Sequence, residues 1–215
     1  MNPKQLAAQL RCPNGDQSAQ VATGMNEANL SVNRKCLQAL AIQPGDKVLE
    51  IGPGNGAFVG QVLAQADGVN YSGVDWSHDM IAAATQLNDD VIRQGRAAFW
   101  QGSSDNLPFA DAQFSKAFSV HTLYFWQHPR EHLAEIRRVL QTGSRLCLAF
   151  GERDFMQGLP FTAFGFRLYH HTEVSDLLAA AGFRVLQLQQ QRETGRSNTG
   201  DMIEKVVNIL LAELP

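Results

Sequence analysis

The segment 48–56, VLEIGPGNG, constrains the fold of this chain more than any other. It begins with a short apolar run that carries the acidic residue Glu50, and three glycines follow at alternate positions. A helical apolar periodicity then begins at Phe58 and Val59. A buried strand, a glycine turn and a helix start in this order predict the place where an open α/β sheet binds a nucleotide-like ligand. Glycines allow the backbone to approach that ligand closely. Glu50, at the strand end, can accept hydrogen bonds from a ligand amine.

Strand-like and helix-like segments alternate through the rest of the chain. Expected strands cover residues 48–51, 71–74, 97–101, 116–120, 145–150, 183–188 and 206–212. We expect a helix over 77–94 capped by Ser77, one beginning at Pro129 with Leu140 in its buried stripe, and one over 172–181 capped by Thr172. This alternation predicts an α/β protein with an open, mostly parallel, seven-stranded Rossmann-like sheet and helices on both faces.

The chain divides into two expected parts. Residues 1–45 precede the first core strand and are predicted to form a helical lid or cap. Residues 46–215 form the expected cofactor-binding domain. Within it, residues 151–171 are long for a connection and rich in aromatic side chains, which predicts a functional insertion.

Composition excludes several classes of protein. The 215 residues are 44% hydrophobic, which is enough for a full core, and the net charge of -3 provides no basic field for nucleic acid. We expect no membrane span and no signal peptide, because no long apolar segment is present and residues 1–10 are polar. The cysteines Cys12, Cys36 and Cys147 are scattered and odd in number, which favours a reducing cytoplasm. The oligomeric state is not specified by the sequence.

The glycine motif by itself fits two cofactors. Gly52-x-Gly54-x-x-Ala57 also satisfies the dinucleotide fingerprint. Asp75 ends the second expected strand. At this position either a nicotinamide ribose or an adenosyl ribose needs a carboxylate that accepts hydrogen bonds from its hydroxyl groups. The alternative for Asp75 is a helix N-terminal acid, although Ser77 already serves as the expected cap.

Three features together favour the adenosyl cofactor: Glu50 with the alternating glycines, the segment 102–109 (GSSDNLPF), and the segment 119–126 (SVHTLYFW). In this order and spacing they resemble the class I S-adenosylmethionine-dependent methyltransferases, in the small-molecule branch similar to quinone-biosynthesis C-methyltransferases. The resemblance covers about residues 45–185. Residues 21–29, VATGMNEAN, resemble the lid segment of one subgroup.

The resemblance implies roles for individual residues around S-adenosylmethionine. Glu50, Gly52, Gly54 and Gly56 surround its methionine part, Asp75 holds the ribose hydroxyls, Trp76 lies against the adenine, Ser103 and Ser104 border the adenine edge, and His121 lies near the sulfonium. The family usually has Asp at the position of Ser103, so a serine hydroxyl or a backbone group replaces that carboxylate here.

Residues for the methyl acceptor are predicted at two places. His121 and Tyr124, after the fourth strand, are the candidate catalytic residues if the acceptor must lose a proton; the alternative for His121 is a pocket histidine without a catalytic role. Tyr124 and Trp126, with Phe155, Phe161, Tyr169 and His170 of the insertion, are predicted to wall the acceptor pocket, and simple core packing is their alternative.

No metal site is expected. His128 and His132 are four residues apart and His170 adjoins His171, but no carboxylate or cysteine completes a ligand pattern, so surface histidines are expected. The sequence therefore predicts an enzyme that transfers a methyl group from S-adenosylmethionine to a small, partly apolar molecule. Two alternatives stay open. An NAD-dependent oxidoreductase would need a catalytic pair such as Tyr-x-x-x-Lys, whereas Tyr124 is followed by His128; a non-catalytic S-adenosylmethionine-binding protein would have an occluded substrate cavity.

Overall fold

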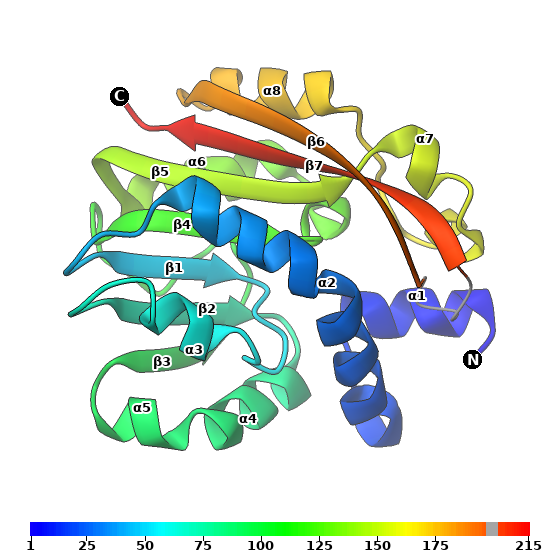
Figure 1. The fold of residues 1–215 in the computed structure, drawn as a ribbon, viewed down its shortest axis with the longest axis horizontal. Helices are drawn as coiled ribbons and strands as arrows, with labels where there is room; N and C mark the ends of the chain where they lie inside the picture. The colour runs from blue at the N-terminus through cyan, green and yellow to red at the C-terminus, as the bar shows by residue number, and fades with distance from the viewer. Residues whose placement is uncertain (197–201) are drawn as a thin grey trace.

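The computed structural model describes residues 1–196 and 202–215, which form three layers, with helices on both faces of a central sheet (Figure 1). The described part of the sheet has seven strands in the order β3-β2-β1-β4-β5-β7-β6. They are β1 (Lys47–Ile51), β2 (Asn70–Asp75), β3 (Ala97–Gln101), β4 (Phe114–Val120), β5 (Leu140–Gly151), β6 (Arg184–Arg196) and β7 (Met202–Glu213). Neighbouring strands from β3 to β5 pair in parallel, whereas β7 is antiparallel to β5 and β6. The predicted mostly parallel, Rossmann-like sheet is confirmed.

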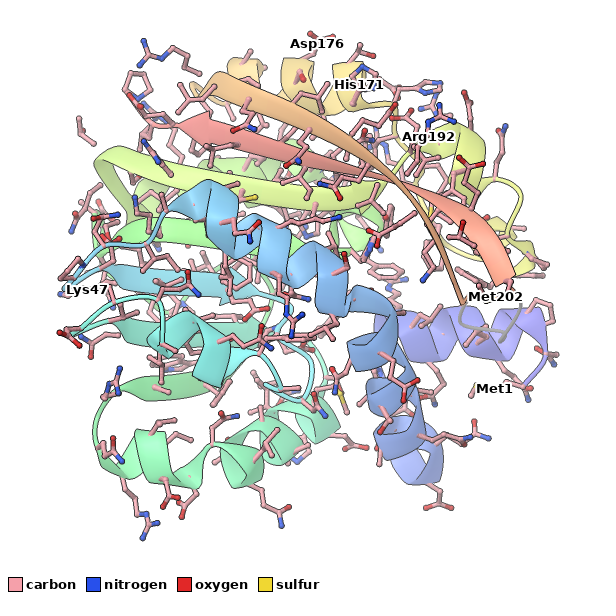
Figure 2. The ribbon with its side chains drawn as sticks, viewed as in Figure 1. Met1, Lys47, His171, Asp176, Arg192 and Met202 are labelled. Atoms are coloured by element: carbon pink, nitrogen blue, oxygen red, sulfur yellow. The ribbon has the colours of Figure 1, made fainter. Side chains whose placement is uncertain are left out.

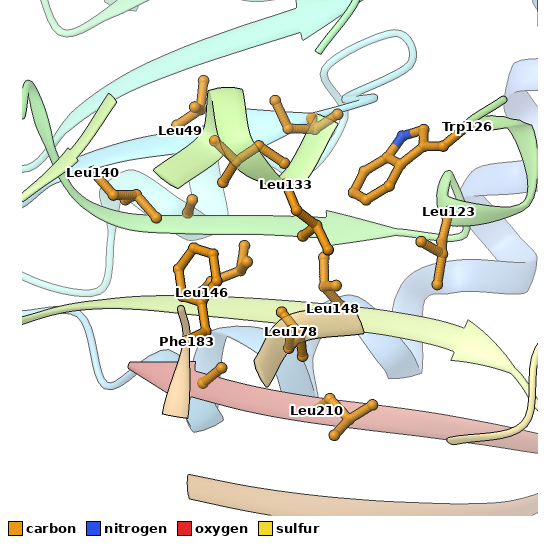
Figure 3. Close-up of a cluster of buried hydrophobic side chains, with 14 of the residues drawn as sticks. Leu49, Leu123, Trp126, Leu133, Leu140, Leu146, Leu148, Leu178, Phe183 and Leu210 are labelled. Atoms are coloured by element: carbon orange, nitrogen blue, oxygen red, sulfur yellow. The ribbon is translucent and has the colours of Figure 1, made fainter. Parts of the chain in front are cut away.

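The helices cover the two faces of this sheet. Their bounds are α1 (Pro3–Arg11), α2 (Ser18–Leu40), α3 (Val59–Leu63), α4 (His78–Leu87), α5 (Asp89–Arg93), α6 (Pro129–Val139), α7 (Arg153–Met156) and α8 (His171–Ala180), with short 3-10 turns η1 (Gly15–Gln17), η2 (Leu123–Phe125) and η3 (Pro160–Ala163). Successive strand residues enter opposite cores because side chains alternate across a strand. Val48 belongs to the apolar cluster that includes side chains of α2 and α3, and Leu49 belongs to the cluster that includes side chains of α6 and α8 (Figure 3).

The amino-terminal segment lies across the carboxyl ends of the strands. Figure 2 labels Lys47 where β1 begins and Met202 at the opposite end of the molecule, where α1 also lies. Asn2 caps α1 by accepting a hydrogen bond from Gln5 N at 2.8 Å. Leu6 and Ala7 of α1 pack against Phe161. The amino-terminal segment is therefore attached to residues 152–171 by apolar contacts.

Three local expectations were wrong. The helix expected over 77–94 is interrupted at Asn88, which leaves helical geometry with φ of -111° and ψ of 20° while its side-chain amide donates to the carbonyls of Gly56 and Ala84 at 3.1 and 2.9 Å. Leu140 begins β5 and does not extend α6. The helix expected to begin after Thr172 is capped by His170, whose backbone N–H donates to Glu173 Oε2 at 2.8 Å.

The closing strands are longer than the apolar pattern predicted. β5 pairs with residues 207–213 of β7, and the described residues of β7 before Val207 pair with β6 alone. This two-stranded extension, residues 192–196 with 202–206, passes beyond the rest of the sheet toward α1 (Figure 1). Residues 192–196 contain no apolar side chain, and residues 202–206 (MIEKV) do not alternate polar and apolar, so the apolar pattern did not identify the extension as strand.

Candidate functional site

Two adjoining cavities lie at the carboxyl ends of the parallel strands. The first, called here the cofactor cavity, has a volume of about 460 Å³ and is lined by the ends of β1, β2 and β4. The second, the acceptor cavity, has a volume of about 570 Å³ and is lined by α2, residues 155–166 and the β6–β7 extension. Five residues line both: Leu10, Met25, Asn29, His121 and Phe125. A ligand in either cavity therefore lies beside a ligand in the other.

The glycine loop forms one wall of the cofactor cavity, and its glycines have different tasks. Gly52 and Gly54 line the cavity with φ of +76° and +56°, a region that side-chain-bearing residues rarely adopt. A Cβ on Gly54 would meet no atom within 4 Å, so the space in front of it is open to a ligand. Gly56 does not line this cavity, and a Cβ at this position would collide with the side chains of Asn88, Ala84 and Phe99. Gly56 is therefore a packing residue, contrary to its expected place around the methionine part.

Glu50 is a buried carboxyl in the cofactor cavity. It ends β1 with 4% of its surface exposed, and Tyr71 donates its hydroxyl proton to Glu50 Oε2 at 2.6 Å. Burial raises the pKa of Glu50 to about 7, and the charge of Asp75 acts in the same direction, whereas the Tyr71 hydrogen bond opposes both. A cationic ligand group beside Glu50 would favour the ionised form.

Asp75 ends β2 and has both carboxylate oxygens engaged by backbone amides. Gly54 N donates to Oδ2 and Ser77 N donates to Oδ1, each at 2.9 Å. Burial raises the pKa of Asp75, and these amide donors partly offset that effect. Each oxygen keeps a lone pair for a ligand, since a carboxylate offers about four acceptor positions. The carboxylate is thus fixed against the glycine loop and can still accept hydrogen bonds from two hydroxyl groups.

The residues expected near an adenine all line the cofactor cavity. Trp76 is half exposed, with the guanidinium of Arg11 4.8 Å above its ring. Ser103 and Ser104 follow β3, and Ser104 is buried with its hydroxyl 2.8 Å from His132 Nδ1. The expectation that His132 is a solvated surface histidine was wrong. It is 6% exposed and stacks on Trp126 at 5.0 Å between ring centroids.

Sequence reasoning missed a row of asparagines. Asn26, Asn29 and Asn33 are spaced i, i+3, i+7 on α2, so they share one helix face, and all three line the cofactor cavity. Asn26 donates to Asn55 of the glycine loop at 3.1 Å. Asn33 is 3% exposed, and its Oδ1 atom has no hydrogen-bond partner. A buried acceptor without a partner is costly, which points to a ligand donor as its partner.

His121 stands where the two cavities meet, in a left-handed backbone conformation with φ of +59°. Gly151 N donates to the Tyr124 hydroxyl oxygen, and that oxygen is 2.9 Å from His121 Nδ1. We assign the Tyr124 proton to Nδ1, because this satisfies all three groups and leaves the imidazole proton on Nε2. Burial, together with the charge of Lys205, lowers the pKa of His121 to about 4. The imidazole is therefore neutral at pH 7.

The acceptor wall is only partly the predicted one. Tyr124, Phe155 and Phe161 line the acceptor cavity, together with Phe166 of the same aromatic segment. Trp126 lines the cofactor cavity, and Tyr169 and His170 line neither cavity. Tyr169 is buried in the core beside α8. His170 and His171 both contact the carboxylate of Glu152, so these two histidines are not simple solvated residues.

The comparisons with known proteins agree with this geometry. A family model described as "Methyltransferase domain" matches residues 49–148. An O-methyltransferase (resE) of Aspergillus sclerotiorum is 28% identical over 86% of this chain and 70% of its own length. A demethylmenaquinone methyltransferase of Beutenbergia cavernae is 32% identical over 63% of this chain and 52% of its own. A solved SAM-dependent methyltransferase from Aquifex aeolicus superposes with a TM-score of 0.66, covering both chains fully at 18% identity.

The fold and the strand-end cavity define an α/β enzyme of the Rossmann-like class. With the matched domain and the named relatives, the chain is a class I S-adenosylmethionine-dependent methyltransferase. S-adenosylmethionine is its cofactor. The residues present fit that molecule, because the open space before Gly54 and the orphan acceptor of Asn33 lie in one cavity with two carboxylates. Among residues 1–196 and 202–215, no set of His, Cys, Asp and Glu side chains gathers into a potential metal site.

Proposed function

We propose that the enzyme methylates a small, partly apolar molecule held in the acceptor cavity. The observation that carries this proposal is the contact of two cavities at His121: one bears the cofactor motifs, and the other is walled by aromatic and aliphatic side chains. The volume of about 570 Å³ is in the range typical of small-molecule sites. Relatives named O-methyltransferase and demethylmenaquinone methyltransferase support a small acceptor. An open cavity beside the cofactor also disfavours a purely binding role.

The proposed cofactor contacts follow the lining of the first cavity. Glu50 and Asn33 receive the ammonium group, Gly52 and Gly54 admit the methionine part, Asp75 accepts from the ribose hydroxyls, and Trp76, Ser103 and Ser104 border the adenine. When bound, the cofactor supplies a sulfonium-activated methyl group. The protein then has mainly to align the acceptor atom with that methyl and to exclude water, which can supply much of the rate.

His121 and Tyr124 are proposed to position the acceptor, and we do not assign them the role of a general base. Nδ1 of His121 is occupied by the Tyr124 proton and Nε2 carries a proton, so the neutral ring donates a hydrogen bond. Tyr124 is itself held by Gly151 N. The pair therefore forms a fixed donor at the junction of the two cavities.

Residues 1–45 are proposed to act as a lid. The Ser77 hydroxyl donates to the Pro13 carbonyl, and Gly15 N donates to Asp79 Oδ2 at 2.8 Å, so the segment crosses the mouth of the cofactor cavity. Lid closure would exclude water and complete the acceptor wall. We also infer a cytoplasmic location and no nucleic-acid partner from the free cysteines and the charge of -3. None of the helices in residues 1–196 and 202–215 has the length and apolar content needed to cross a bilayer.

The test combines labelling with one variant. Purified enzyme is incubated with methyl-labelled S-adenosylmethionine and a fractionated metabolite extract, and labelled small molecules are identified by mass spectrometry. Asp75→Ala should weaken cofactor binding by roughly 1.5–3 kcal/mol, the range for hydrogen bonds to a charged group, while the protein stays folded. Label appearing only in macromolecules, with wild-type cofactor affinity in Asp75→Ala, would contradict both the acceptor class and the ribose role.

A further inference from the structure

The acceptor cavity contains one lysine and no arginine among its described lining residues. Lys205 lies on the β6–β7 extension and lines this cavity together with His121 and the aromatic residues of 155–166. The other charged lining residues are Glu27, which is exposed on α2, and Glu193. An ammonium group on an otherwise mostly apolar wall has few solvent contacts and is available to a ligand of opposite charge.

The nearby carboxylate does not pair directly with Lys205. Glu193 is opposite Lys205 in the β6–β7 ladder, but its Oε1 atom lies 3.5 Å from Lys35 Nζ and accepts a hydrogen bond from Ser31 at 3.3 Å. No carboxylate of the described residues lies within 4 Å of the Lys205 ammonium. Burial lowers the pKa of Lys205, and Glu193 opposes that shift from a distance. Lys35 thus neutralises Glu193 from the α2 side and leaves the charge of Lys205 for the cavity.

Lys205 and the donor group of His121 are near each other. Both line the same cavity, and the positive charge of Lys205 contributes to the lowered pKa of His121. His121 carries its proton on Nε2 because Nδ1 accepts from Tyr124. A cation and a neutral N–H donor therefore line the same cavity, and His121 lies at its junction with the cofactor cavity. Phe155, Phe161 and Phe166 line the same cavity.

We propose that the acceptor binds as an oxyanion, the ionised form of an aromatic or enolic hydroxyl, with its oxygen held by the Lys205 ammonium and the His121 Nε2–H. This inference rests on the proposed function and adds the chemical class of the acceptor. The hydroxyl proton leaves to solvent before transfer; an oxygen lone pair then forms the bond to the methyl carbon, while the carbon–sulfur bond breaks and its electron pair stays on sulfur. Stabilising the oxyanion lowers the pKa of the acceptor and removes the need for a general base.

The test uses acidic hydroxy compounds and their neutral methyl ethers. 2-Hydroxy-1,4-naphthoquinone and 2,4-dinitrophenol, both ionised at neutral pH, are each compared with the methyl ether by calorimetry, with S-adenosylhomocysteine saturating the cofactor cavity. The wild type should bind at least one ionised compound about tenfold or more tightly than its ether, as expected for a charge-assisted hydrogen bond. Lys205→Met should lose this preference, and Lys205→Arg should retain most of it.

Lys47→Met is the control, because it removes a lysine that lines neither cavity and begins β1 at the opposite end of the sheet from the two cavities. It should keep the preference for the ionised compound. Visible absorption of the bound compound gives a second readout, since its pKa should be lower on the wild type than on Lys205→Met. Equal binding of ion and ether by the wild type, or a preference that survives Lys205→Met, would overturn the oxyanion assignment and leave a small-molecule acceptor standing. Failure of every compound to bind would overturn both.

Discussion

Glu50 connects the buried end of β1 to the charge of the cofactor. Its pKa of about 7 means that a substantial fraction is protonated at pH 6 to 7, whereas a ligand ammonium requires the carboxylate. Binding of S-adenosylhomocysteine, which carries the same ammonium, should therefore release a proton. We expect its affinity to fall by up to about tenfold per pH unit below 7 and to level off above it. Calorimetry at pH 6 and pH 8 measures this difference.

Glu50→Gln should make cofactor affinity weaker and independent of pH over this window. In the ligand-free protein, Glu50 makes folding stability, rather than binding, depend on pH, and the dependence has the opposite direction. The folded-state pKa lies above that of the unfolded chain, so this group lowers stability as pH rises from about 4.5 to 7, and Glu50→Gln should abolish that decrease. A pH dependence of binding that is unchanged in Glu50→Gln would assign the titration to another group.

Replacing Asn33 should affect stability and cofactor affinity in opposite directions. Its Oδ1 atom is buried without a partner, so Asn33→Leu should leave the ligand-free protein as stable as wild type or more stable. The same change should weaken S-adenosylhomocysteine by roughly 1.5–3 kcal/mol if the atom accepts from the ligand ammonium. Thermal unfolding with and without ligand separates the two effects. Unaltered ligand affinity would show that Asn33 Oδ1 faces away from the bound cofactor.

At the scale of elements, α1 and η1 belong to the proposed lid and lie outside the two main core clusters. Residues 3–17 contact Trp76, Ser77, Asp79 and Phe161 as well as α2, whereas α2 contributes Cys36, Leu37 and Leu40 to the main core. Deleting residues 1–17 should therefore leave a folded protein with much reduced transfer. Hydrogen exchange in residues 3–17 of the intact chain should slow when cofactor binds.

A shorter variant serves as the control for this deletion. Removing residues 1 and 2 takes away the cap of α1 but leaves Arg11 and Pro13, so transfer should largely survive. Full activity after deletion of residues 1–17, combined with unchanged exchange on cofactor binding, would argue against a lid.

Some elements of the fold were predictable from the sequence and others were not. The parallel strands and glycine loop were predictable because buried strands give continuous apolar runs and positive φ values demand glycine. The break at Asn88 was not, because it depends on a carbonyl of Gly56 that is remote in sequence. Trp126 and Tyr169 were placed in the acceptor wall from their proximity in sequence to His121 and to the insertion. The roles of Lys205 and Asn33 could not be predicted, because the sequence does not show which cavity a charged strand residue or a row of helix asparagines will face.

For the whole molecule, cofactor binding should appear as a specific thermal stabilisation. A ligand at a hundred times its Kd adds about 2.7 kcal/mol, which for a chain of 215 residues corresponds to a Tm increase of about 5–10 °C. S-adenosylhomocysteine should give this shift in differential scanning calorimetry, and NADH should give none. Asp75→Ala should reduce the shift at the same ligand concentration. A response to NADH alone would contradict the cofactor assignment.

The β6–β7 extension lines the acceptor cavity but lies apart from the residues at the cofactor site. Residues 192–196 and 202–206 form a ladder with each other, and Glu152 N after β5 donates to the Val206 carbonyl at 2.9 Å, so the five parallel strands contact this extension mainly at its base. The glycine loop and Asp75, in contrast, are attached to those strands and to each other. Substitutions or insertions in the hairpin can therefore alter which molecule is methylated while the methyl donor stays the same. If the acceptor binds as proposed, its choice depends on the edge of the sheet that is least involved in holding the cofactor.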